Sequence, residues 1–236
     1  MSGLYLSRLR LNHDAPAAAL SALLDPDDRA LALDAHHRLL WTLFSDGRDR
    51  RRDFLWRANG RGDFYVLSRR TPSPSELFHP PETRPFEPAL SPGDRLSFML
   101  RANATRDRTT AQRAKDDRRK DRRVDIVMDA LRKIPVGEQR SLRRNEIAEE
   151  VALAWMTRQG DRNGFSVNEL QLEGYEAVPL LRAGTKTPRD RAPRLGIVDV
   201  LGDITVTDPN AFLERLAQGF GRAKAFGCGL MLIRRV

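Results

Sequence analysis

The 236-residue chain is basic, with 41 lysine and arginine residues against 32 aspartate and glutamate residues and a net charge of +9. This excess favours a polyanionic partner. The chain has no apolar run near the roughly 18 residues of a membrane helix. Cys228, the single cysteine, excludes an internal disulfide. We therefore expect a soluble protein of the reducing cytoplasm.

The first part of the chain contains strand, helix and hairpin signals in that order. Apolar and polar residues alternate over residues 4–11, which is typical of a strand. Residues 28–44 have the spacing of a helix. Two short apolar runs, 54–56 and 64–67, flank an Asn-Gly turn signal and predict a hairpin. Residues 71–93 are rich in proline, so we expect weak structure there and a boundary between domains.

The second part repeats this alternation of strands and helices. We expect strands at 96–102, 165–172, 177–181 and 230–233, helices at 124–131, 146–155 and 208–216, and a hairpin from 195–200 and 203–206. The order predicts an α+β fold built from a ferredoxin-like βαββαβ unit used twice. We place the two domains at residues 1–93 and 94–236.

A glycine-rich segment lies near the end of the chain, between the last expected helix and the last expected strand. It contains four glycines and two cations: Gly219, Gly221, Gly227, Gly229, Arg222 and Lys224. Glycine permits positive φ and close backbone approach, and the cations suit phosphate. Nucleotide-binding loops run from strand to helix, whereas this one runs from helix to strand. The segment therefore favours a polyphosphate backbone such as RNA over ATP or NAD.

The chain has four histidines that could take part in acid–base chemistry: His13, His36, His37 and His79. No histidine, cysteine or carboxylate grouping has metal-ligand spacing, so we expect no metal. Helical periodicity places His37 on an apolar face with Leu33, Leu40, Trp41 and Phe44. A buried structural histidine is the alternative there. RNA also allows cleavage without a metal, in which a base activates the 2′-hydroxyl, an acid protonates the leaving 5′-oxygen and cations stabilise the charge.

Five segments, in order, resemble one known family. Residues 219–230 resemble the signature G-x-G-x-x-K-x-x-G-x-G-L of the CRISPR repeat-processing endoribonucleases of the type I-E system, the CasE family. Residues 4–12, 37–44, 52–57 and 100–103 agree as well. The glycine signature alone is shared by many CRISPR RNA-binding proteins, but the ordered combination is more specific.

The resemblance implies two ferredoxin-like domains and cleavage of a stem–loop repeat RNA at the 3′ side of its stem. Cleavage in the family needs no metal or other cofactor and leaves a 2′,3′-cyclic phosphate. It also implies that the enzyme keeps its product, the crRNA, and joins other subunits in the surveillance complex Cascade. Target DNA is then contacted only through the complex.

The resemblance further assigns roles to individual residues. His37 matches the catalytic histidine of the family, and His36 is an adjacent competitor. Asp34 stands where the family has a tyrosine that assists catalysis. An aspartate can orient His37 and raise its pKa, but it cannot replace a phenol as a proton donor at neutral pH.

Basic residues of this chain then become candidate RNA contacts. Residues 101–123 hold ten of the arginines and lysines and four aspartates. A solvated loop and a coding bias toward arginine are the alternatives. In addition to the residues of the glycine segment, the candidates are Arg52, Arg101, Asn103, Arg106, Arg113, Lys115, Arg118, Arg119, Lys120, Arg122 and Arg123.

Two other functions remain open from the sequence. The first is a non-catalytic RNA-binding subunit of a CRISPR complex, which the missing tyrosine supports. The second is a DNA-binding accessory protein, which the basic charge alone supports.

Overall fold

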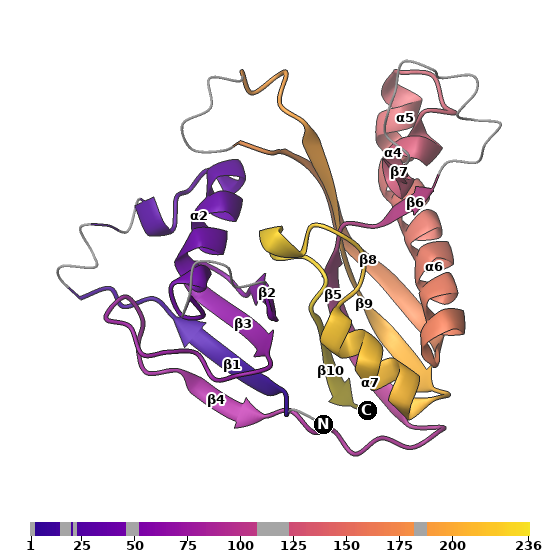
Figure 1. Ribbon diagram of the computed structural model, residues 1–236. Coiled ribbons are helices and arrows are strands. Elements are labelled where there is room, and N and C mark those ends of the chain that lie inside the picture. Colours follow the sequence, from indigo (N-terminus) through magenta and orange to yellow (C-terminus); the bar gives the residue numbers. More distant parts are fainter. Residues whose placement is uncertain (1–2, 15–19, 21–22, 46–51, 108–122, 182–187) are drawn as a thin grey trace. The chain divides into compact units, whose positions relative to one another are not determined.

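The computed structural model describes residues 3–14, 20, 23–45, 52–107, 123–181 and 188–236 (Figure 1). The chain forms two compact units that interleave along the sequence. The first comprises Met1–Ala89, Val178–Leu195 and Glu214–Leu230, and the second comprises Leu90–Ala177, Gly196–Leu213 and Met231–Val236. The glycine-rich segment therefore belongs to the same unit as the N-terminal sheet.

The first unit is built on a four-stranded antiparallel sheet with the order β2-β3-β1-β4. Its strands are β1 (Tyr5–Arg10), β2 (Phe54–Ala58), β3 (Asp63–Ser68) and β4 (Glu82–Pro85). Helix α2 (Arg29–Trp41) covers one face of this sheet (Figure 1). This strand order is that of a βαββαβ unit. Residues 69–81, between β3 and β4, contain no second helix.

Alternation along the strands explains the core of the first unit. Leu9, Phe64 and Val66 are fully buried, while their strand neighbours Arg8 and Tyr65 are partly exposed. Apolar residues at the end of α2 and just beyond it complete the same cluster. The helix begins after Asp28, whose carboxylate accepts a hydrogen bond from the Ala30 backbone N–H at 2.8 Å.

The proline-rich segment contains a strand that the sequence did not predict. Strand β4 pairs with β1, with Arg84 opposite Leu6 and Pro85 opposite Tyr5. Proline is tolerated because β4 is an edge strand and Pro85 is its last residue. The expectation of weak structure was therefore wrong at residues 82–85.

The second unit repeats the strand order in a second four-stranded sheet, β10-β5-β9-β8. Its strands are β5 (Arg95–Ala102), β8 (Phe165–Pro179), β9 (Arg194–Val206) and β10 (Met231–Arg235). Its helices are α6 (Arg144–Asn163) and the first part of α7 (Pro209–Gln218), whose residues from Glu214 onward belong to the first unit. An insertion between β5 and α6 contains β6 (Thr105–Asp107), β7 (Arg123–Asp125), α4 (Ile126–Leu131) and α5 (Glu138–Leu142). The expected α+β class with two ferredoxin-like units is confirmed.

Residues 194–206 form one continuous strand, so the hairpin expected around Gly202 was wrong. Gly202 pairs with Phe98 of β5 in regular register. A Cβ at this position would lie 2.0 Å from the backbone oxygen of Glu169 in β8. The glycine thus allows close approach of two strands instead of making a turn. No helix in the described ranges is long and apolar enough to span a membrane.

Candidate active site

The two adjacent histidines of α2 lie in different environments. His36 is 6% exposed, and its Nε2 lies 2.8 Å from Oδ1 of Asp25. The centres of the His36 and Phe64 rings lie 4.8 Å apart in a T-shaped arrangement. Burial lowers the pKa of His36, although Asp25 opposes this shift. His37 is only partly buried, and its ring lies 6.4 Å from that of Phe226. The role of a buried structural histidine, which was the alternative for His37, therefore belongs to His36. The side of α2 that faces the core is centred on the position one residue before His37.

The imidazole of His37 is held by a neighbour on its own helix. Trp41 Nε1–H donates a hydrogen bond to His37 Nε2 at 3.2 Å. Nδ1 of His37 is buried and has no hydrogen-bond partner among the described residues. Burial lowers the pKa of His37 and Arg52 lowers it further, while Asp34 raises it. The neutral imidazole is therefore favoured at pH 7, which is the form that can accept a proton.

Asp34 acts on His37 through its charge. Its carboxylate pairs with Arg38 on the next turn of α2, with 3.1 Å between Arg38 Nη2 and Asp34 Oδ2. No hydrogen bond joins Asp34 to His37 in the part of the chain that the structure describes. An ionised carboxylate has only acceptor oxygens, so Asp34 supplies no proton. Its contribution is to favour the imidazolium form.

The glycine-rich segment folds against the same strand and helix that carry this site. It contains a short 3-10 helix, η1 (Lys224–Phe226), which packs against α2 and β2. All four predicted glycines have positive φ. A Cβ at Gly219 would lie 2.7 Å from Leu55 Cδ1, and one at Gly227 would lie 3.0 Å from the Trp56 ring. The glycines therefore let the loop pack on β2, which brings η1 to His37.

Three half-buried cations are coupled to one another through Lys224, and we call them the cation cluster: Arg52, Arg215 and Lys224. Burial lowers the pKa of Lys224, and Arg215 and Arg52 lower it further. Arg52 also acts electrostatically on His37. Among the described residues, no carboxylate acts on the pKa of Arg52 or Lys224. Like charges held together in partial burial favour a bound anion.

Sequence reasoning missed Arg215. It lies in the last turn of α7, directly before the glycine-rich segment, and its guanidinium is 5.2 Å from the centre of the Phe220 ring. The sequence did contain a signal for Arg215, because a cation directly before a predicted phosphate-binding loop is itself a candidate phosphate contact. Arg222, which the sequence did predict, is exposed.

Four other predicted RNA contacts lie in the second unit, where each bonds to a neighbour. Arg101 makes two bonds to Asp199, at 2.8 and 3.0 Å. Asn103 is buried and donates to the Gly196 carbonyl at 2.7 Å. The remaining pairs are Arg106 with Asp129 and Arg123 with Asp107. Six further candidates lie outside the described residues: Arg113, Lys115, Arg118, Arg119, Lys120 and Arg122.

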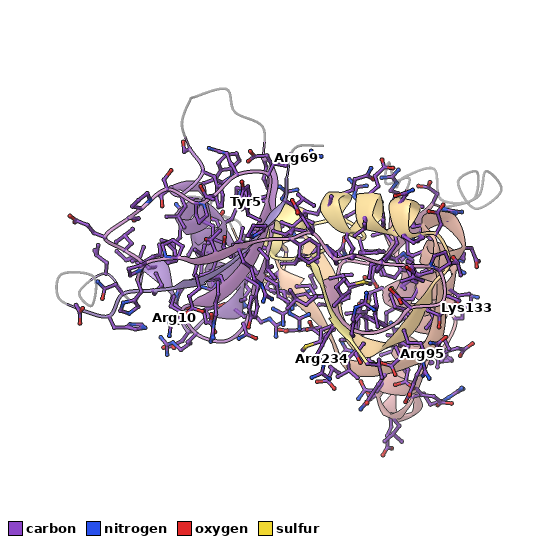
Figure 2. The ribbon with its side chains drawn as sticks, turned by 90° about the horizontal axis from the view of Figure 1, so that it is seen from below. Tyr5, Arg10, Arg69, Arg95, Lys133 and Arg234 are labelled. Carbon is purple, nitrogen blue, oxygen red and sulfur yellow. The ribbon has the colours of Figure 1, made fainter. Side chains whose placement is uncertain are left out.

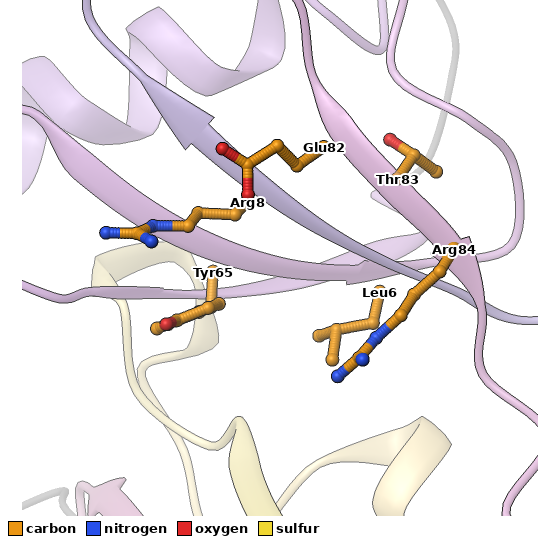
Figure 3. Close-up of a pocket in the computed structure, with 6 residues that line it drawn as sticks. All are labelled: Leu6, Arg8, Tyr65, Glu82, Thr83 and Arg84. Carbon is orange, nitrogen blue, oxygen red and sulfur yellow. The ribbon is translucent and has the colours of Figure 1, made fainter.

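Basic side chains are spread over both units, as Arg10, Arg95 and Lys133 illustrate (Figure 2). A separate pocket on β1, β3 and β4 is lined by Leu6, Arg8, Tyr65, Glu82, Thr83 and Arg84 (Figure 3). Arg8 is bound there by both carboxylate oxygens of Asp63. This pocket contains no histidine, in contrast to the site at α2. Within the described ranges, no three His, Cys, Asp or Glu side chains gather closely enough to hold a metal ion.

Comparison with known proteins gives a consistent match over most of the chain. The model of a family described as CRISPR associated protein matches residues 4–235. The CRISPR-associated endoribonuclease Cse3 of Thermus thermophilus is 27% identical, covering 98% of this chain and 99% of that protein. The CRISPR system Cascade subunit CasE of Escherichia coli is 26% identical, covering 83% and 88%. A solved structure of Thermus thermophilus Cse3 bound to an RNA representing a pre-cleavage complex is 25% identical, covers 98% and 99%, and has a TM-score of 0.61.

Proposed function

Because the chain belongs to the CRISPR associated protein family, we propose that it is an endoribonuclease that cleaves the repeat stem–loop of precursor crRNA. The observation that carries the proposal is the position of His37 on α2, where η1 with Lys224 packs against the helix and Arg52 of the cation cluster acts on the imidazole. Relatives named as an endoribonuclease and as a Cascade subunit support it. So does the similarity to a structure of such a relative with RNA.

The proposed reaction is attack of a ribose 2′-oxygen on the adjacent phosphorus at the 3′ side of the stem. The new P–O2′ bond forms as the P–O5′ bond breaks, leaving a 2′,3′-cyclic phosphate and a 5′-hydroxyl. The 2′-hydroxyl loses a proton and the leaving 5′-oxygen gains one. His37 supplies one of these transfers. Arg52, Arg215 and Lys224 stabilise the charge that develops on the phosphate oxygens.

The wider function is retention of the crRNA within a Cascade complex in the cytoplasm. Exposed Arg222 extends the cationic surface beyond the cation cluster. Arg101, Arg106 and Arg123 add positive charge in the second unit, although each is paired with an aspartate. A-form RNA is recognised mainly through its shape and phosphates, so dispersed arginines suit a stem. Target DNA is reached only through the assembled complex.

The test uses a repeat hairpin RNA in the presence of EDTA. Wild-type protein should release a fragment that ends in a cyclic phosphate, and His37→Ala should reduce the single-turnover rate about 100-fold or more while RNA binding survives. His79→Ala, which changes an exposed histidine, is the matched control and should cleave normally. A 2′-deoxy nucleotide upstream of the cut should block the reaction. Undiminished cleavage by His37→Ala would contradict the assignment.

The alternative is a non-catalytic RNA-binding subunit. Asp34 favours it, because the aspartate cannot act as the donor that the family tyrosine provides. In the same EDTA assay, a shifted but intact RNA band for the wild-type protein would support this alternative.

A further inference from the structure

The hydrogen bond between Trp41 and His37 has a fixed direction. An indole N–H can only donate, so Nε2 of His37 must be the acceptor and carries no proton in this arrangement. The bond spans four residues of α2, the spacing at which helical side chains meet. The Trp41 ring is itself held at 5.4 Å from Phe54, edge to face. The packing thus aims the donor at one particular nitrogen.

The second imidazole nitrogen completes the assignment. In neutral histidine one nitrogen carries the proton and the other accepts. With Nε2 accepting from Trp41, the proton lies on Nδ1, which is buried and has no acceptor among the described residues. If Nε2 carried the proton, the N–H groups of His37 and Trp41 would face each other and could not form a hydrogen bond. The indole therefore stabilises the form of His37 that can take up a proton.

We propose that Trp41 is the positioning residue of His37: its indole N–H keeps Nε2 unprotonated and so assigns His37 the role of general base. The inference rests on the proposed function. In the reaction, the 2′-hydroxyl of the ribose takes the place of the indole as donor to Nε2. The proton then moves from O2′ to Nε2 as O2′ attacks phosphorus, and the leaving 5′-oxygen takes its proton from another group or from water.

Charged groups around His37 act on the same equilibrium. On α2, Asp34 favours the imidazolium, and Arg38 is engaged with Asp34. Arg52, ahead of β2, disfavours the imidazolium. Lys224 on η1 and Arg215 on α7 add positive charge beside Arg52. All of these groups remain in a Trp41→Phe variant, so this variant isolates the indole N–H.

The direct test is a pH titration of His37 by ¹⁵N NMR, without RNA. The wild-type protein should show the tautomer with the proton on Nδ1. In Trp41→Phe the protonation constant should rise about 2- to 10-fold, the effect of one lost hydrogen bond to the neutral form. Trp155→Phe, a buried tryptophan of the second unit, is the matched control and should leave His37 unchanged. A merely structural tryptophan would lower thermal stability without moving this titration.

The kinetic test is the single-turnover cleavage rate against pH. For a general base, the rate rises with pH through the pKa of His37, and Trp41→Phe should move this limb to higher pH. A rate that falls through that pKa would overturn the base assignment, and an Nε2–H tautomer in the wild type would overturn the hydrogen bond even if the variant fails to fold. Absence of cleavage by the wild type would instead contradict the proposed function, while the titration would still decide the role of Trp41.

Discussion

At the scale of single residues, the adjacent histidines of α2 have different roles, because successive side chains of a helix point in directions about 100° apart. His36 bonds to Asp25 inside the core, and His37 lies beside the cation cluster. Sequence periodicity predicted the helix but not which of its faces packs on the sheet, because both histidines lie next to apolar residues. Only the contacts of the strands beneath α2 decide which histidine is buried.

His36 predicts a pH dependence of stability. Its pKa is lowered in the folded protein, so the unfolded chain, with a pKa of about 6.5, binds more protons just below that pH. The free energy of unfolding should therefore be highest above pH 6.5 and fall as the pH is lowered below it. His36→Gln, which does not titrate, should be less stable at pH 7 and lose less stability between pH 7 and 5. Thermal unfolding measures both effects.

His79→Gln changes an exposed histidine and should retain the wild-type pH dependence. Some dependence should remain in His36→Gln as well, because the pKa of His37 is also lowered. An unchanged slope in His36→Gln would show that the buried pair does not contribute.

At the scale of elements, the glycine-rich segment has a structural reason that its composition did not reveal. Glycines and cations predicted a phosphate-binding loop, and the order of helix, loop and strand is confirmed. Two of these glycines, Gly219 and Gly227, however, have positive φ where the loop packs on Leu55 and Trp56 of β2. That packing is a long-range contact, for which the local sequence carries no signal. The same limit explains why β4, defined by its pairing with β1, was missed.

Gly227→Ala tests this packing. Gly227 has φ of 73°, and a Cβ there would lie 3.0 Å from the Trp56 ring. We expect a loss of roughly 1–2 kcal/mol in the free energy of unfolding, measured with urea. Cleavage should also slow, because displacement of η1 moves Lys224 and Phe226 away from α2. Gly174→Ala is the control, since its Cβ would meet nothing within 4 Å. Equal stability of the two variants would contradict this role.

At the scale of the whole molecule, charge serves binding and reaction differently. The net charge of +9 is distributed over both units, whereas the cation cluster belongs to the first alone. The sequence predicted the basic character and both sheets, because composition and periodicity are local properties. It could not predict that Glu214–Leu230 returns to the N-terminal unit. It therefore placed the glycine loop and His37 in separate halves of the chain.

The variant Lys224→Gln distinguishes the contribution of positive charge to RNA binding from its contribution to the cleavage rate. Affinity for the repeat RNA should fall only slightly, because many basic residues share the phosphate contacts, and the slope of log K against log salt should decrease by about 1. The single-turnover rate should fall about 100-fold, since Lys224 lies beside Arg52 and Arg215, where charge develops on the phosphate. Lys133→Gln removes an exposed lysine of the second unit and is the matched control. It should cleave at the wild-type rate. If Lys224→Gln lost affinity and rate in equal proportion, Lys224 would be a binding residue only.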